Sequence, residues 1–378
     1  MKSPKIRFKG FDGDWEQRKF GDFTWDAGKR NKENLNLVPY AITNEHGFIP
    51  QSEAHDEFGY MKDTDRRAYN IVEPNSFAYN PARINVGSLG YYEGTENVIV
   101  SSLYEVFKTA EYVDDRFLWH WLKSPELPKW IGKLQEGSVR LYFYYDKLCE
   151  CVLQMPSVEE QRKISKYLDS LDHLITLHQK KFEQLTILKK YMLQKMFPQN
   201  GSDKPEIRFE GFTDDWEQRK LSDVVDVRSG RDYKHLEEGD IPVYGTGGYM
   251  LSVSEALSDD EDAIGIGRKG TIDNPYILRA PFWTVDTLFY AVPREKHDLN
   301  FVYGIFQNIN WKAKDESTGV PSLSKATINA VSTMTPDYEE QRLIGEYFSN
   351  LDHLITLHQQ KCDELRNAKK FMLQNMFI

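Results

Sequence analysis

The octapeptide Leu171-Asp172-His173-Leu174-Ile175-Thr176-Leu177-His178 occurs a second time, unchanged, as Leu351-Asp352-His353-Leu354-Ile355-Thr356-Leu357-His358. Around each copy, apolar residues alternate at spacings of four and three, which predicts a long helix with a coiled-coil seam. The predicted seam consists of Ile164, Leu168, Leu171, Ile175, Phe182 and Leu185 in the first copy and Ile344, Phe348, Leu351, Ile355 and Leu365 in the second. A histidine and then a lysine interrupt both seams, at His178 and Lys189 and at His358 and Lys369.

Both long repeats begin with a helix-start pattern. Ser157 with Glu160, and Asp337 with Glu340, have the spacing of a capping box. Neither repeat contains an internal proline, so we expect helices within 156–198 and 336–378. Antiparallel packing of the two helices would relate the two halves of the chain by a pseudo-twofold axis. A parallel pair, or packing against another protein, remains open at this stage.

A second, shorter repeat divides the rest of the chain. Residues 4–20, which begin Pro4-Lys5-Ile6-Arg7-Phe8, return as residues 205–221, which begin Pro205-Glu206-Ile207-Arg208-Phe209. The order is short repeat, insert, long repeat, written twice, and the two inserts show no comparable similarity. We therefore expect an α+β protein in which two globular α/β domains, 1–155 and 199–335, are separated by two long helices that form an antiparallel coiled coil.

Short apolar runs in both inserts, among them 98–100, 141–145, 241–244 and 288–292, predict strands, and 117–122 and 301–306 predict short helices.

The composition is that of a globular protein and excludes several classes. The 378 residues carry a net charge of −10, with 40% hydrophobic and 28% charged residues. No apolar run is long enough to span a membrane, and the first residues do not resemble a secretory signal. Three cysteines are too few for a disulfide framework, so we expect a cytoplasmic protein. The acidic balance requires that any binding of nucleic acid use local basic patches or basic partners.

The sequence contains no complete catalytic or metal-binding motif. Gly265-Ile266-Gly267-Arg268-Lys269-Gly270 matches a dinucleotide fingerprint, but a turn follows it where a helix is required. Asp273-Asn274-Pro275-Tyr276 lacks one proline of an adenine methyltransferase loop, and no Walker A sequence is present. The histidines of each long repeat are five residues apart and do not share a helix face. Cys149 and Cys151 could lie on one side of a strand, but without further ligands we expect them to be packing residues.

Basic, polar and aromatic residues recur in glycine-rich loops of both inserts, where they can meet phosphates and base edges. Taken singly, each is an ordinary solvated loop residue. The candidates are Tyr79, Asn80, Arg83, Asn85, Ser88, Ser138 and Arg140 in the first insert, and Arg228, Arg231, Tyr233, Lys234, Tyr244, Thr246, Arg268, Lys269, Thr271, Ser322 and Lys325 in the second.

Over essentially its whole length the chain resembles the specificity subunit of type I restriction-modification systems. The resemblance rests on Pro-x-Glu-Glu-Gln-Arg, Leu-Asp-x-Leu-Ile and Lys-Lys-x-Met-Leu-Gln-x-Met-Phe within 156–197 and 336–377. Tyr79-Asn80-Pro81 and Gly267-Arg268-x-Gly270-Thr271 look like patterns of the family's two target-recognition domains. The combination of these motifs is specific, whereas no single one of them is.

The resemblance implies a non-catalytic protein in which each recognition domain reads half of a bipartite double-stranded DNA target. It also implies two modification subunits that bind the helices and methylate adenine, and two restriction subunits that cleave. S-adenosylmethionine, ATP and Mg²⁺ would then belong to those partners, and this chain would bind no cofactor. Because the frames match and the inserts differ, we expect an asymmetric target and two equivalent docking sites. A self-contained methyltransferase or nuclease, and a coiled-coil scaffold for proteins, are the alternatives.

Overall fold

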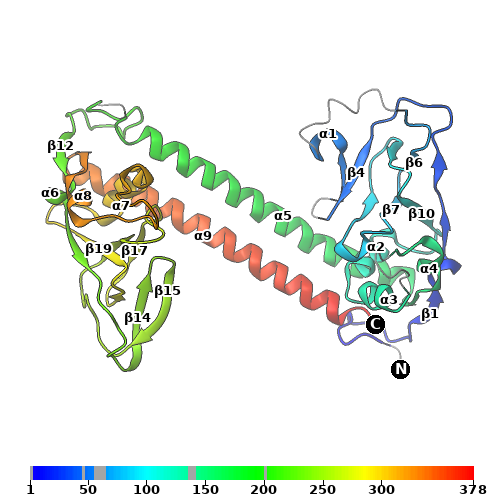
Figure 1. The fold of residues 1–378 in the computed structure, drawn as a ribbon. Helices are drawn as coiled ribbons and strands as arrows, with labels where there is room; N and C mark the ends of the chain where they lie inside the picture. The colour runs from blue at the N-terminus through cyan, green and yellow to red at the C-terminus, as the bar shows by residue number, and fades with distance from the viewer. Residues whose placement is uncertain (1–2, 45–46, 55–64, 135–141, 200–201) are drawn as a thin grey trace. The chain divides into compact units, whose positions relative to one another are not determined.

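The computed structural model describes residues 3–44, 47–54, 65–134, 142–199 and 202–378. The chain forms two compact units. Unit 1 comprises residues 1–177 and 362–378, and unit 2 comprises residues 178–361. Each unit therefore combines one mixed α/β domain with part of both long helices, which are green and red in Figure 1.

The two long helices, α5 (Val158–Lys195) and α9 (Tyr338–Asn375), have 38 residues each. In unit 1, Asp172 binds Lys369 and the Cys362 thiol donates to the carbonyl of Ile175. The partner number falls as the α5 number rises, so the helices are antiparallel there. In unit 2 the pairs His178–His358 and Lys189–Asp352 show the same direction. The prediction of two β-containing domains with two long helices packed together is confirmed.

The residues of the predicted seam are buried or half-buried along both helices. The two lysines that interrupt the seam each bind an aspartate of the other helix. Lys189 Nζ lies 2.6 Å from Asp352 Oδ1, and Lys369 Nζ lies 2.6 Å from Asp172 Oδ2. The pairing satisfies an ammonium that would otherwise be desolvated without a partner.

The two histidines of the seam contact each other, with 2.9 Å between His178 Nδ1 and His358 Nδ1. Such a contact requires one nitrogen to donate and the other to accept, so the rings cannot both be charged. Burial, followed by the proximity of His178 and of Lys181, lowers the pKa of His358.

We expect acid to weaken this contact. A folded-state pKa below the unfolded value means that the unfolded chain binds more protons, so stability is lost as pH falls below about 6.5. The wild-type melting temperature should therefore fall more between pH 7.5 and pH 5.5 than that of His358→Gln, which cannot titrate. Thermal melts of both chains measure this difference, and equal pH slopes would contradict it.

Arginines of the short repeats bind the first turn of each long helix. Arg7 donates to both carboxylate oxygens of Glu160 at 2.7 and 2.8 Å, and Arg208 does the same to Glu340 at 2.7 Å each. One of the two hydrogen bonds of each predicted capping box forms. The Ser157 side chain accepts from the backbone amide of Glu160, and the Asp337 side chain accepts from that of Glu340. The glutamate carboxylates bind the arginines and not the cap backbone, which corrects that part of the prediction.

Each short repeat also joins the opposite helix ends of its unit through the backbone. The Ile6 amide donates to the carbonyl of Asn375 at 3.0 Å, and the Ile207 amide donates to the carbonyl of Lys195 at 2.9 Å. The strand at the end of each short repeat pairs with the strand that leads into the long helix, β1 with β11 and β12 with β20. The bounds are Glu16–Lys19, Val152–Met155, Glu217–Lys220 and Ser332–Thr335.

The domain of unit 1 contains a four-stranded antiparallel sheet in the order β2-β10-β7-β8. Its strands are Thr24–Asp26 (β2), Glu105–Thr109 (β10), Ser76–Tyr79 (β7) and Leu89–Tyr92 (β8). Smaller sheets are β3-β6-β9 (Lys29–Arg30, Asn70–Val72, Val98–Val100) and β4-β5 (Tyr40–Thr43, Gly47–Pro50). The helices are α1 (Gln51–Ala54), α2 (Asp115–Lys123), α3 (Glu126–Leu134) and α4 (Tyr145–Glu150), with 3₁₀ turns Phe20–Asp22 and Ile84–Val86.

The domain of unit 2 has a four-stranded antiparallel sheet in the order β13-β19-β16-β17. Its strands are Val225–Ser229 (β13), Leu288–Pro293 (β19), Ala263–Gly267 (β16) and Tyr276–Leu278 (β17). A second sheet, β15-β14-β18, uses Gly248–Val253, Glu238–Gly245 and Trp283–Thr284. The helices are α6 (Leu221–Val224), α7 (Leu299–Asn308) and α8 (Lys325–Ala330), with a 3₁₀ turn Trp311–Lys314.

The inserts share a topology that their sequences do not reveal. In each four-stranded sheet, the strand that comes first in the chain pairs with the strand that comes last. That last strand also pairs with the strand that comes second in the chain. In both domains a helix follows, and an aspartate caps it: Asp114 accepts from Phe117 and Asp298 accepts from Phe301. Glutamines Gln161 and Gln341 of the long helices accept from the amides of those two aspartates.

One local prediction is wrong, and one placement that the sequence allowed does not occur. The run 141–145 was expected to form a strand, but Tyr145 begins α4, and Leu141 lies outside the described residues. Cys149 lies within α4 and Cys151 caps its end, so the two cysteines do not share one side of a strand. The alternating tyrosines of this run imitate the period of a strand.

Candidate nucleic-acid interface

A cavity of about 480 Å³ in unit 1 collects polar and aromatic side chains from loops at the edge of the sheets. We call it the unit 1 loop cavity. Asn80 and Arg83 come from the turn after β7, and the rings of Tyr142 and Tyr144 stack with centroids 5.5 Å apart. The Asn80 side chain accepts from the amide of Ala82 at 3.0 Å, which holds the turn. Arg30 also lines the cavity.

The other predicted residues of unit 1 lie elsewhere. Tyr79 is fully buried in β7, and Ser88 is buried and donates to the carbonyl of Ile42 at 3.1 Å. Asn85 is exposed on the 3₁₀ turn that follows the cavity. Ser138 and Arg140 lie outside the described residues. Tyr79 and Ser88 therefore belong to the interior and offer no surface to a ligand.

A second cavity of about 480 Å³, the unit 2 loop cavity, forms where several loops of unit 2 meet. Tyr233, Lys234 and Thr246 line it together with Tyr249 and Asp286. Gly248, at the turn between β14 and β15, has φ +104°, a conformation that side chains with a Cβ rarely adopt. Tyr249, which directly follows Gly248, lines the same cavity as Thr246.

Backbone hydrogen bonds bring the remaining predicted loops of unit 2 together. The Arg268 amide donates to the carbonyl of Thr287 at 2.8 Å, and the Leu323 amide donates to the carbonyl of Arg268 at 3.0 Å. Arg231 is tied to Thr284 in the same way at 2.8 Å. The exposed side chains on these loops are Arg231, Lys234, Arg268, Lys269 and Thr271, whereas Tyr244, Ser322 and Lys325 are half-buried.

One predicted phosphate ligand is occupied by acidic partners. Arg228 binds Asp226 at 2.7 Å and also binds Glu261, and these contacts raise its pKa well above the usual value. Its charge is therefore already neutralised within the protein. Sequence reasoning also missed Tyr142, Tyr144 and Tyr249, whose only signal was a polar-aromatic loop composition.

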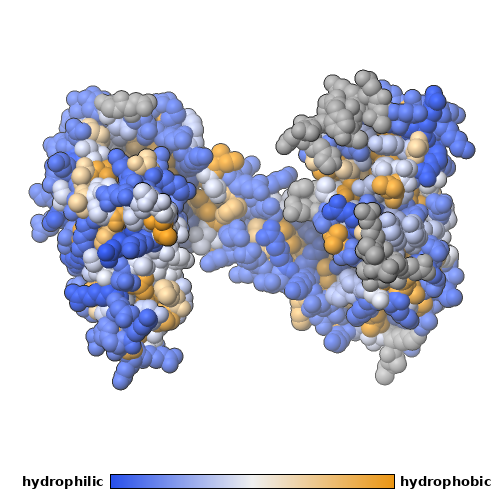
Figure 2. Space-filling view, in the orientation of Figure 1, coloured by the Kyte–Doolittle hydropathy of each residue, from blue (hydrophilic) through white to orange (hydrophobic). Residues whose placement is uncertain are grey.

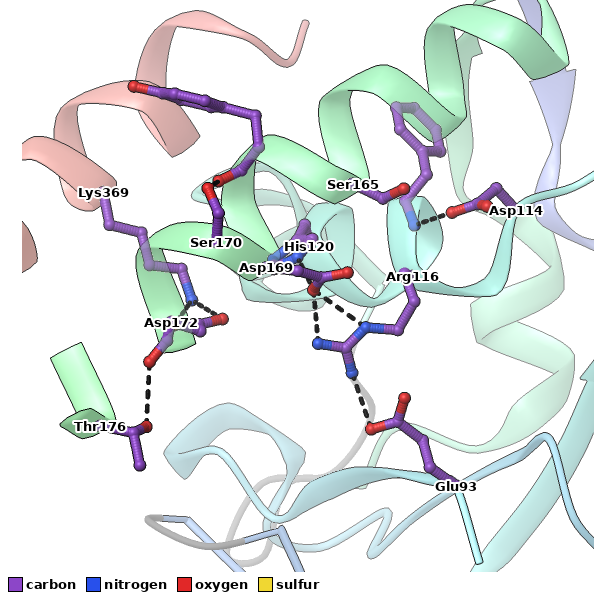
Figure 3. Close-up of polar contacts among 12 residues, drawn as sticks. Glu93, Asp114, Arg116, His120, Ser165, Asp169, Ser170, Asp172, Thr176 and Lys369 are labelled. Atoms are coloured by element: carbon purple, nitrogen blue, oxygen red, sulfur yellow. Dashed lines mark hydrogen bonds and ion pairs between the residues drawn. The ribbon is translucent and has the colours of Figure 1, made fainter. Parts of the chain in front are cut away.

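Beside α2 in unit 1, a network of ion pairs links the domain to the long helices (Figure 3). Arg116 and His120 both bind Asp169, and Arg116 also binds Glu93 at 3.1 Å. Burial raises the pKa of Asp169, but hydrogen bonds from His120 and Arg116 outweigh it and bring the pKa to about 2. Burial lowers the pKa of His120.

His120, Asp169 and Asp172 are close enough to share a metal ion, and no other such group is found among the described residues. Arg116 and Lys369 already bind the two carboxylates. A donor set neutralised by two internal cations is suited to an ion-pair network and does not fit a metal site.

Within the described part of the chain, no helix is long and apolar enough to cross a membrane.

These features define a two-module binding protein: two mixed α/β domains with different loop surfaces on one repeated helical frame. The model of the type I restriction modification DNA specificity domain matches residues 13–186 and 213–367. The chain therefore belongs to the specificity subunit family of type I restriction-modification systems. Such a subunit provides the DNA specificity of the system and is non-catalytic within the complex.

Individual relatives agree with this assignment. The MjaVIII specificity subunit of Methanocaldococcus jannaschii is 22% identical, over 94% of this chain and 90% of that protein. The crystal structure of the type I S subunit from M. genitalium has a TM-score of 0.69 at 16% identity and covers 100% of this chain and 99% of that chain. A chain from a structure on complex assembly of the type I R-M system has a TM-score of 0.51 at 15% identity, with 97% and 98% covered. The structural likenesses establish the fold.

Proposed function

We propose that residues 1–155 and 199–335 are two target-recognition domains, each of which reads one half of an asymmetric bipartite sequence in double-stranded DNA. The observation that carries the proposal is the pair of loop cavities, which differ in their residues on a repeated frame. Unit 1 offers Asn80, Arg83 and a stacked tyrosine pair, and unit 2 offers Tyr233, Lys234 and Thr246. Arginine, lysine and asparagine are the usual readers of base edges and phosphates.

The segments 156–198 and 336–378, which contain the long helices, would set the distance between the half-sites and bind two modification subunits. Those subunits would methylate adenine with S-adenosylmethionine, and restriction subunits would add ATP-dependent cleavage. This division explains how a chain with a net charge of −10 can act on DNA. The partners would supply much of the phosphate contact, and the cofactors would be theirs.

Exposed apolar side chains on the long helices support the docking of two equivalent partners. Unit 1 exposes Leu174, Leu177 and Phe371, and unit 2 exposes the equivalent Leu354, Leu357 and Tyr191. All six lie on the same two heptad positions, directly before and two residues after a seam residue. Equivalent positions of an antiparallel pair face one side of it, so each unit presents an apolar strip. Orange atoms interrupt the blue surface of the helices in Figure 2. Such strips mark protein contacts.

A methylation map tests the proposal. The chain is co-expressed with its modification subunit in a methylation-free host, and N6-methyladenine is located by single-molecule sequencing. We expect a split, asymmetric motif, and exchange of residues 222–335 for those of another family member should change one half only. A palindromic or continuous motif, or a motif in which both halves change, would contradict two independent reading domains.

A further inference from the structure

A cavity of about 1050 Å³ in unit 1 shares no described lining residue with either loop cavity. We call it the helix-side cavity, because α2 and both long helices contribute to it. Aromatic side chains Tyr40, Phe48 and Trp119 line it from the hairpin β4-β5 and from α2. Lysines Lys123, Lys369 and Lys370 line it from α2 and α9. The volume and the mixed lining are those of a site for a small ligand.

The charge of the cavity is opposite to that of the protein. Among the described residues that line it, five side chains are cationic and two are acidic, whereas the whole chain has a net charge of −10. Some of these cations are held by carboxylates, as Figure 3 shows for Lys369 on Asp172 and Arg116 on Asp169. Lys123 and Lys370 have no carboxylate oxygen within 4 Å among the described residues. Two ammonium groups are therefore left for an anion.

Lys123 is the better placed of the two. Its Nζ lies 4.5 Å from the centre of the Trp119 ring, so a cation and an aromatic face are held side by side. The Lys123 side chain is partly exposed, but the protein around it, followed by the nearby charge of Lys369, lowers its pKa. A bound anion would offset both effects, because an opposite charge favours the charged ammonium.

Unit 2 shows that the fold does not require these cations. Aligning the helix caps Asp114 and Asp298 places Asn300, Tyr303 and Gln307 of α7 at the positions of Arg116, Trp119 and Lys123. The frame keeps its lysine–aspartate pair in both units, but the lysine of α2 is replaced by a neutral amide. Lys123 is thus a property of unit 1 and not of the repeated scaffold.

We propose that the helix-side cavity binds a nucleoside phosphate, with the base against the aromatic side chains and the phosphate on Lys123 and Lys370. Stacking on aromatic rings beside a cation is the way proteins hold nucleotides without reading their sequence. The ligand is either a free nucleotide or a nucleotide of a DNA strand, since both offer the same chemistry. This role is separate from reading the target.

Titration of the full chain with N-methylanthraniloyl-ATP, followed by fluorescence anisotropy, tests the first source. Lys123→Gln, which introduces the residue of unit 2 at that position, should raise Kd about tenfold through loss of one charge-assisted contact. Trp119→Leu should weaken the nucleotide but leave inorganic phosphate, measured as a competitor, unchanged. Gln307→Ala, the matched position in unit 2, should bind as the wild type does.

A single-stranded oligo(dA) of eight nucleotides tests the second source in the same assay. Binding of the oligonucleotide alone, with the same dependence on Lys123 and Trp119, supports the strand as the ligand. Failure of both probes to bind, or binding that neither variant weakens, overturns the proposal. Because methylation specificity is mapped separately, Lys123→Gln should leave the methylated motif unchanged, and the two proposals can fail independently.

Discussion

Replacing Arg208 by alanine is expected to destabilise unit 2 by about 3–5 kcal/mol, because it leaves a buried carboxylate without its partner. The Glu340 side chain is 0% exposed, and Arg208 is 13% exposed. Both oxygens of Glu340 accept from Arg208 at 2.7 Å. Removing both charges together, as Arg208→Met with Glu340→Leu, should cost less than the single change, because no charge is then left buried.

Hydrogen exchange of the full chain, read on peptides from the first turns of α9, measures the effect where it arises. Arg219→Ala provides the control, because Arg219 and its partner Glu217 are 43% and 70% exposed. Loss of that pair should change stability by less than about 1 kcal/mol. Arg7→Ala is the matched variant in unit 1, where Glu160 is 1% exposed, and it should raise exchange at the start of α5. Equal effects of Arg208→Ala and Arg219→Ala would contradict the argument.

The long helices could be predicted because their signals are local. The caps at Ser157 and Asp337 and the seam spacing lie within single segments, and the structure places helices of 38 residues there. The partners of the polar seam residues could not be predicted in the same way. That Lys189 meets Asp352 depends on the direction and register of the pair, which neither helix specifies alone.

The sequence predicted which loops line the candidate site, but not which side chains of those loops face it. Asn80 and Arg83 line a cavity, but the side chain of Tyr79, one residue before Asn80, is buried in β7. Every residue of β7 is buried, so the usual alternation of inward and outward side chains gives no guide there. Tyr249 was missed because its exposure depends on the turn at Gly248. The side chains that face a ligand are decided by tertiary packing around loops.

The shared sheet topology of the inserts shows the limit of sequence comparison in the other direction. The two inserts show no sequence similarity comparable to that of the repeats, yet both sheets have the same strand order and an aspartate-capped helix after the last strand. The two inserts share their topology and their contacts to the long helices, such as the contact of Gln161 with Asp114 in unit 1. The side chains of the loops are free to differ, which is the arrangement expected of modules that read different sequences.

Charged substitutions on the apolar strip of one unit are expected to remove one of two modification subunits. Leu357 and Tyr191 in unit 2 are 47% and 48% exposed, so glutamate at both positions should alter folding stability little. In a closed interface the same carboxylates would be desolvated without partners. Each desolvated carboxylate at the centre of a contact should cost about 2 kcal/mol, the energy of a typical hot spot. The two carboxylates together should therefore cost more than the loss of one hot spot.

Native mass spectrometry of the purified complex measures the result as stoichiometry. The wild type should bind two modification subunits, Leu357→Glu with Tyr191→Glu should bind one, and the matched unit 1 variant, Leu177→Glu with Phe371→Glu, should also bind one. All four substitutions together should leave the chain unbound. Lys190→Glu, about 100° around α5 from Tyr191, adds a carboxylate outside the two heptad positions of the strip and should keep both subunits. Two bound subunits in the unit 2 variant would place the docking surface elsewhere. Loss of both from a change in one unit would show that the sites are coupled and not independent copies.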